Sequence, residues 1–286
     1  MNRFTSLLLL VIYSSIAGAW TFDETFEEQS VGTRASSTSA QWFSKTIVTD
    51  TVVPPGKSIA VELGITGGKN GWGEFGGIYT FPQALKAGDK VWFRVRQFFP
   101  ESFDYRSSTF ALKFMRIHTR NATTLANEGY LDIYVRPDGT LLFQSELGGT
   151  KDGSFKVQAQ EWFSAQNRQD LRVINPVVKK GVWETYEVYA DFQVGEGPAT
   201  FRAWKNGELV YENKKWTTLR SADSESDMAL IYTYWNGNAP QTQTMYMSDF
   251  TVTSDMPPAR DADGNPYLGM HSTSNSPAPP ADLSVQ

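Results

Sequence analysis

Apolar and polar residues alternate with a period of two along most of the chain. The alternation is clearest in residues 91–96, 130–136 and 183–192, where every second side chain is apolar and many of the others are charged or aromatic. Such alternation is typical of β-strands that bury one face and leave the other in water. Further strands are predicted at residues 21–26, 58–63, 76–81, 110–119, 140–145, 199–204, 228–234 and 244–253.

Turn residues separate these segments, as in the Arg-Pro-Asp-Gly run at 136–139 and the Lys-Asn-Gly-Glu run at 205–208. No stretch has the pattern of a long helix, and no internal repeat is visible. Many short strands without a break in composition predict an all-β fold, an antiparallel two-sheet jelly-roll sandwich that forms one domain over residues 20–269. Residues 149–176 alternate least, so we expect a long loop there that carries Trp162 and Phe163.

Both ends of the chain differ from this body. Residues 1–3 carry a positive charge, residues 7–13 are apolar, and a small-residue stretch ends at Ala19, which is the pattern of a signal peptide over residues 1–19. We therefore expect cleavage near Ala19 and secretion, extracellular or periplasmic. The apolar run is too short for a membrane span, and no later segment is long enough. Residues 270–286 are rich in Ser, Pro and Ala, which predicts a disordered tail.

The composition removes several classes of function. The 286 residues include no cysteine, which excludes disulfides, thiolate metal sites and a cysteine nucleophile. The net charge of −5, without a run of Lys or Arg, argues against a nucleic-acid partner. An anionic substrate would have to meet a local basic cleft. We expect a monomer.

Two predicted strands combine aromatic and polar side chains on one face, as a carbohydrate cleft requires. One strand presents Trp92, Arg94 and Arg96, and another presents Tyr130, Asp132, Tyr134 and Arg136. Aromatic rings can lie flat against sugars while the polar groups bind hydroxyls and carboxylates. The alternative is an ordinary solvated outer face, because antiparallel sheets commonly leave one side in water.

The residues most suggestive of catalysis lie in 113–119. His118 is the one histidine of the predicted body, and Arg116 shares its face of the strand, whereas Lys113 lies on the opposite face unless a β-bulge intervenes. A structural role for His118 is the alternative. A second aromatic and polar cluster occupies 232–238, where Tyr232 and Tyr234 share a face; simple packing is the alternative there.

Several segments resemble the concanavalin-A-like jelly-roll polysaccharide lyases, in particular the glucuronan, alginate and heparin lyase-like groups. The resemblance rests on residues 71–77, 91–94, 99–105, 112–118, 181–187 and 234–238, and it extends over about residues 22–269. The Gln-Ile-His triplet familiar from alginate lyases is absent. Arg116, Ile117 and His118 stand in what would be the equivalent place.

The resemblance implies β-elimination on an anionic, uronic-acid-containing polysaccharide. The enzyme must neutralise the uronate carboxylate, remove the adjacent proton and protonate the departing oxygen. Arg94, Arg96 and Arg116 are then candidate carboxylate binders, and His118 is a candidate base or neutralising group. Tyr134, Tyr232 and Tyr234 are candidate acids or bases. The other candidate substrate-binding residues are Trp92, Lys113, Tyr130, Asp132, Glu74, Trp235 and Asn236.

Two other functions stay open, a non-catalytic carbohydrate-binding protein and, with less support, a glycoside hydrolase. A hydrolase needs two suitably spaced carboxyl groups. The alternating Glu-x-Asp-x-x-Glu run of sandwich glucanases is absent, and the acidic residues 223–227 are predicted to be a solvated loop. Residues 261–265 offer oxygen ligands but do not fit a calcium loop, so we expect a polar turn. We expect no cofactor and no catalytic metal; a structural calcium ion elsewhere stays open.

Overall fold

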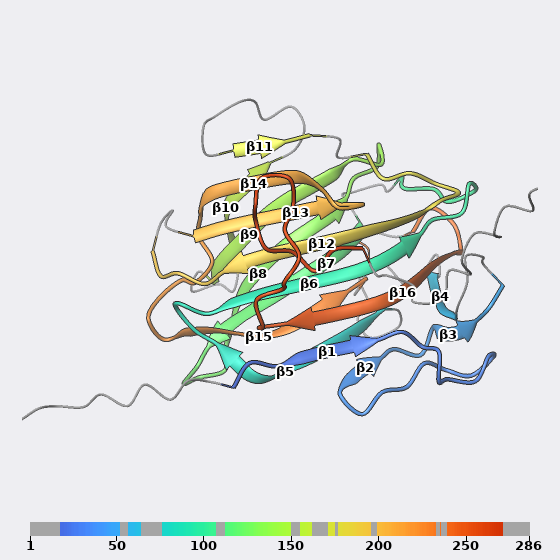
Figure 1. Ribbon diagram of the computed structural model, residues 1–286, viewed down its shortest axis with the longest axis horizontal. Helices are drawn as coiled ribbons and strands as arrows, with labels where there is room; N and C mark the ends of the chain where they lie inside the picture. Colours follow the sequence, from blue (N-terminus) through green and yellow to red (C-terminus); the bar gives the residue numbers. More distant parts are fainter. Residues whose placement is uncertain are drawn as a thin grey trace, which may run out of the picture.

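The computed structural model describes residues 18–51, 57–63, 76–106, 112–149, 155–161, 171–174, 177–195, 199–232, 235 and 239–270. Within these residues the chain forms sixteen strands and no helix, arranged as two antiparallel sheets packed face to face (Figure 1). The predicted all-β two-sheet sandwich is therefore confirmed. None of the described segments is a helix that could cross a membrane.

Sheet A contains nine of the described strands. Its order is β11 (Leu171–Val173), β14 (Glu208–Trp216), β13 (Ala199–Lys205), β12 (Trp183–Asp191), β6 (Lys90–Phe98), β16 (Gln243–Thr253), β4 (Ser58–Leu63) and β3 (Thr46–Thr49), with β1 (Thr21–Glu24) also paired to β16. Strand β6 lies centrally between β12 and β16, which run antiparallel to it. Sheet A therefore joins strands from both ends of the chain.

Sheet B contains seven described strands. Its order is β10 (Phe155–Glu161), β9 (Leu141–Gly149), β8 (Asn127–Val135), β7 (Leu112–Asn121), β15 (Ser224–Ile231), β5 (Gly77–Leu85) and β2 (Ala40–Trp42). Strands β10 and β11 fall inside residues 149–176, so the prediction of one long loop there is wrong. Trp162 and Phe163 lie outside the described residues.

The space between the sheets is filled by the apolar residues of the alternating pattern. Aromatic rings dominate it: Phe143 stacks on Tyr211 and Phe201 stacks on Trp216, each pair with ring centroids 4.0 Å apart. Burying a large apolar side chain contributes about 1.5–3 kcal/mol. In the absence of disulfides, this packing is the main source of stability.

The outer face of sheet A is covered by the chain itself. The segment 254–270 crosses its strands, as the red trace in Figure 1 shows, and binds them through polar contacts. Trp92 Nε1 donates to Pro266 O at 3.0 Å, and Trp204 Nε1 donates to the Asp261 carboxylate at 2.8 Å. The buried Glu187 accepts hydrogen bonds from the backbone of Leu268 and Gly269. The part of this face around Trp92, Trp204 and Glu187 is therefore covered.

Candidate active site

The outer face of sheet B carries a cluster of polar side chains from three neighbouring strands. Across the β7–β8 ladder, Lys113 lies opposite Tyr134, Arg116 opposite Asp132, and His118 opposite Tyr130. The polar cluster, as it is called below, consists of these six residues and of Gln144 and Glu146 on β9, which lie opposite Asp132 and Tyr130.

A β-bulge brings Lys113 to the face that Arg116 and His118 already share. The β7–β8 register shifts between Lys113 and Met115, so one extra residue stands in β7. Without it, Lys113 and Arg116 would point to opposite faces, because side chains alternate along a regular strand. This is the irregularity that a site shared by Lys113, Arg116 and His118 requires.

Arg116 is held at the centre of the cluster by its neighbours. Its Nε donates to Asp132 Oδ1 at 2.5 Å, and its guanidinium carbon lies 3.6 Å from the centroid of the Tyr130 ring. The second oxygen of Asp132 accepts the Tyr134 hydroxyl at 2.8 Å. Arg116, Asp132 and Tyr134 are all nearly fully buried. The guanidinium therefore has a fixed position and a carboxylate partner.

Lys113 is buried beside this pair, and its nitrogen lies 6.0 Å from the Tyr134 ring centroid. Burial lowers its pKa from the ordinary 10.5 to about 7, and the Arg116 charge acts in the same direction. Burial also raises the pKa of Glu146, and the negative Asp132 adds to that effect. Near neutral pH a fraction of Lys113 is therefore an uncharged amine, which can accept a proton.

His118 is held by an acidic residue that sequence reasoning placed in a solvated loop. Its Nδ1 lies 2.5 Å from Asp227 Oδ1, and the other oxygen of Asp227 lies 2.9 Å from Arg120 Nη1. Asp227 is buried on β15, at a bulge between Ser226 and Met228. The prediction of a loop at 223–227 is wrong because the local Ser, Asp and Glu composition resembles a turn. Only the pairing with β7 reveals the strand.

Trp92, Arg94 and Arg96 do not join the polar cluster, because they lie on β6 of sheet A. Trp92 and Arg94 face the C-terminal segment, where Arg94 donates to Gly269 O at 3.0 Å. Arg96 lies 3.7 Å from Asp249 and 5.4 Å from the Trp183 ring centroid. The expected common cleft with Tyr130 and Asp132 does not form. The alternation predicts which residues share a face but not to which sheet that face belongs.

Tyr232 and Trp235 are core residues. The Tyr232 hydroxyl donates to Gln97 Oε1, and its ring stacks on Phe114 with centroids 5.2 Å apart. A left-handed backbone at Tyr232, with φ of 48°, directly after β15 ends the regular alternation. Trp235 is fully buried and lies parallel to Phe103. Neither residue reaches the polar cluster. Tyr234, Asn236 and Glu74 lie outside the described residues.

No cluster of three or more His, Asp or Glu residues suited to a metal ion occurs in the described part of the chain. Residues 261–265 form a turn in which the Asp261 carboxylate accepts hydrogen bonds from the backbone of Asp263 and Asn265. Those oxygens are occupied by the turn. Within the polar cluster, the side chains present are suited to binding an anion and transferring protons.

Comparison with solved structures identifies the class of fold. The endo-β-1,4-glucuronan lyase of the fungus Trichoderma reesei matches with a TM-score of 0.56 at 10% identity, covering 82% of this chain and 95% of that one. Alginate lyase vAL-1 from Chlorella virus matches with a TM-score of 0.54 at 14% identity, over 76% and 92% of the two chains. Alginate lyase Aly36B matches with a TM-score of 0.54 at 15% identity, over 81% and 96%.

These matches establish that the chain has the jelly-roll fold of polysaccharide lyases, which confirms the predicted resemblance at the level of the fold. The identities are too low to carry over an activity or a residue. No family model matches the sequence. No curated protein matches it by sequence either.

Proposed function

We propose that this protein is a secreted polysaccharide lyase that cleaves a uronic-acid-containing polysaccharide by β-elimination. One observation carries the proposal: a buried lysine with a pKa of about 7 lies on the same sheet face as an arginine, a histidine and two tyrosines. A lysine that is partly uncharged near pH 7 is suited to general-base catalysis. The lyase fold of the structural neighbours supports the same chemistry.

In this proposal Lys113 removes the proton next to the uronate carboxylate. The positive charge of Arg116 favours binding of the carboxylate and stabilises the negative charge that develops on it, and His118 can hydrogen-bond to the same group. The departing glycosidic oxygen takes a proton from Tyr130. Burial raises the pKa of this phenol, which keeps it protonated, and it is the more exposed of the two cluster tyrosines. Tyr134 instead donates a hydrogen bond to Asp132 and so orients the carboxylate that binds Arg116.

The test is ultraviolet absorbance with purified protein and a panel of alginate, glucuronan, heparin-type, hyaluronan and pectic polymers. Elimination leaves a conjugated double bond, so absorbance should rise with one polymer. Lys113→Ala should reduce that rate by a factor of about 100 or more, the usual contribution of a general base. Lys86→Ala is the matched control, because Lys86 is exposed at the turn between β5 and β6. Flat absorbance with every polymer, or full activity in Lys113→Ala, would refute the proposal.

A specific observation also favours a non-catalytic carbohydrate-binding protein. Arg116 and Tyr134 are nearly fully buried and both bind Asp132, as structural residues do. In that case a polymer retards the protein in an affinity gel, and neither absorbance nor reducing ends increase. New reducing ends without absorbance would instead indicate hydrolysis. The carboxylates of Asp132 and Glu146, on neighbouring strands, would then be the pair to mutate.

A further inference from the structure

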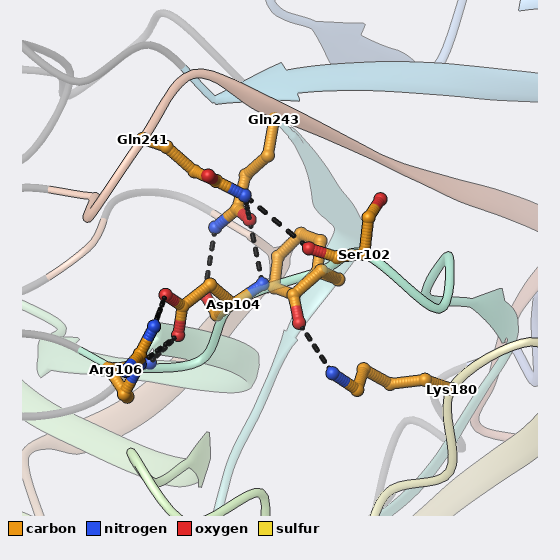
Figure 2. Close-up of polar contacts among 7 residues, drawn as sticks. Ser102, Asp104, Arg106, Lys180, Gln241 and Gln243 are labelled. Carbon is orange, nitrogen blue, oxygen red and sulfur yellow. Dashed lines mark hydrogen bonds and ion pairs between the residues drawn. The ribbon is translucent and has the colours of Figure 1, made fainter.

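A cavity of about 600 Å³ opens at one end of the sandwich, outside the polar cluster. Three segments line it: residues 102–106 between β6 and β7, the turn 137–139 between β8 and β9, and residues 177–180 before β12; Gln241 completes the wall. Its volume falls in the usual range for small-molecule sites. Figure 2 shows the polar side chains of this region.

The wall formed by residues 102–106 is fixed by side-chain hydrogen bonds. Gln243 accepts from Asp104 N at 2.8 Å and donates to Asp104 O at 2.9 Å (Figure 2). Gln241 Nε2 lies 3.4 Å from Ser102 O, and Lys180 Nζ donates to Phe103 O at 2.9 Å. The wall is therefore formed before any ligand arrives, which reduces the entropy lost on binding.

The other two walls are joined in the same way. Val178 N donates to Gly139 O at 2.9 Å, which ties the β8–β9 turn to the segment before β12. Gly139 has φ of 78°, and a Cβ there would lie 3.3 Å from the Tyr105 ring. This turn position requires glycine, because a side chain would be strained and would press against that ring.

The polar groups left to a ligand are mainly donors. The Asp104 carboxylate accepts three hydrogen bonds from the Arg106 side chain, and the Asp138 carboxylate binds Thr140 and lies 3.4 Å from Arg136. Among the described residues, Lys180 Nζ has one hydrogen-bond acceptor and Arg106 Nη1 has none. An ammonium has three N–H groups and a guanidinium five. The cavity can therefore still bind an anion.

We propose that this cavity is a second saccharide site, which holds one uronate unit by its carboxylate between Lys180 and Arg106. The amide of Gln241 and the exposed apolar surface of Pro137 and Val177 suit the hydroxyls and the ring of a sugar. The choice of a uronate rests on the proposed function. The charge and the fixed walls are independent of it.

The cavity adjoins the Lys113–Tyr134 end of the polar cluster. Strand β8 carries Tyr134 and continues directly into the turn at Pro137. At roughly 3.5 Å per residue, the Cα atoms of Tyr134 and Pro137 are at most about 11 Å apart. One polymer chain can therefore contact both sites, and a second contact raises the affinity for long chains without changing the chemical step.

Binding of single sugars tests the site separately from catalysis. Glucuronate, mannuronate, guluronate, galacturonate and neutral glucose are titrated into the protein and followed by ligand-observed NMR. We expect at least one uronate to bind, glucose to bind at least 10-fold more weakly, and Arg106→Gln to weaken uronate binding at least 5-fold. Arg106 is 82% exposed, so this variant should retain the fold. Lys180→Gln should have the same effect, and Lys214→Gln, an exposed lysine of sheet A, should have none.

The outcomes separate this site from the proposed lyase activity, because a single uronate has no glycosidic bond to cleave. Absence of uronate binding, equal binding of glucose, or unchanged binding in both Arg106→Gln and Lys180→Gln would overturn the second site. Uronate binding that depends on Arg106 would support it even if no polymer gave an absorbance signal, in which case only the lyase proposal fails. If both hold, Arg106→Gln raises KM for long polymers at least 3-fold and leaves kcat unchanged.

Discussion

Replacing Lys113 with methionine should stabilise the protein at neutral pH and abolish a specific part of its pH dependence. Lys113 is 5% exposed, and its amine has a pKa of about 7 in the folded protein against an ordinary 10.5. Between about pH 7 and pH 10.5, the unfolded chain therefore keeps a proton on the Lys113 amine that the folded chain has released. Under proton linkage the free energy of unfolding then rises with pH in that window.

The magnitude follows from the two pKa values. A difference of about 3.5 in pKa corresponds to about 5 kcal/mol at 25 °C, the full cost of keeping this lysine charged in the fold. From about pH 7 to about pH 9 the wild type should gain roughly 3 kcal/mol from this one group. Methionine has a similar length and no charge. The variant should lack this gain and should be most stabilised, relative to wild type, at or below about pH 7.

Urea unfolding followed by tryptophan fluorescence at several pH values between 6 and 9.5 measures the effect. The informative quantity is the difference between wild type and Lys113→Met at each pH, because the other titrating groups then cancel. Lys86→Met controls for the loss of an exposed lysine. Parallel curves for wild type and Lys113→Met would refute the reasoning. They would show that the amine titrates normally, and they would also remove the basis for Lys113 as a catalytic base.

Three further predictions concern other parts of the structure. Asp227→Asn should keep the fold but reduce turnover by about 10-fold or more, because the His118 ring loses the carboxylate that orients it; unchanged turnover would contradict this. Gly129→Ala should lower the free energy of unfolding in urea by roughly 3 kcal/mol or more, because φ is 136° and a Cβ would overlap a β9 carbonyl oxygen. The control Gly264→Ala, where a Cβ would meet open space, should lower it by only about 1–2 kcal/mol. Burial raises the pKa of Glu187 to about 8, so stability should fall as pH rises from about 4.5 to 8, and Glu187→Gln should flatten that decline in denaturation curves; an equally steep decline would contradict this.

The sequence was sufficient for the fold class because period-two alternation is a local property of each strand. The expected strand at 58–63 has the observed bounds, and the segments around β6, β8 and β12 were also recognised. The unpredicted strands were β2 and β3, which are short, and β10, β11 and β14. Of these, β10 and β14 form hairpins with β9 and β13, the strands directly before them, whereas β11 pairs with β14 from further along the chain.

The candidate site was predictable only in part. Tyr130, Asp132 and Tyr134 were recognised as one face, and they do form part of the polar cluster. Trp92 and Arg94 have the same alternating pattern, yet their face is covered by residues 254–270. That cover depends on contacts between residues more than 170 positions apart in the chain, which neither composition nor spacing encodes.

Two β-bulges determine the chemistry of the polar cluster. In a regular β7, Lys113 would lie on the face opposite to Arg116. In β15, Met228 pairs with His118 and shares its face, so in a regular strand the neighbouring Asp227 would lie on the opposite face. The bulges place the Lys113 amine and the Asp227 carboxylate on the outer face of sheet B. An extra residue leaves ladder groups unpaired, and such irregularities are frequent beside active sites. Deletion of Phe114 would leave Lys113 two positions from Arg116, on the same face of a regular strand. A deletion variant that folds should therefore keep Lys113 in the cluster and retain turnover, and loss of turnover in a folded variant would contradict the role given to this face.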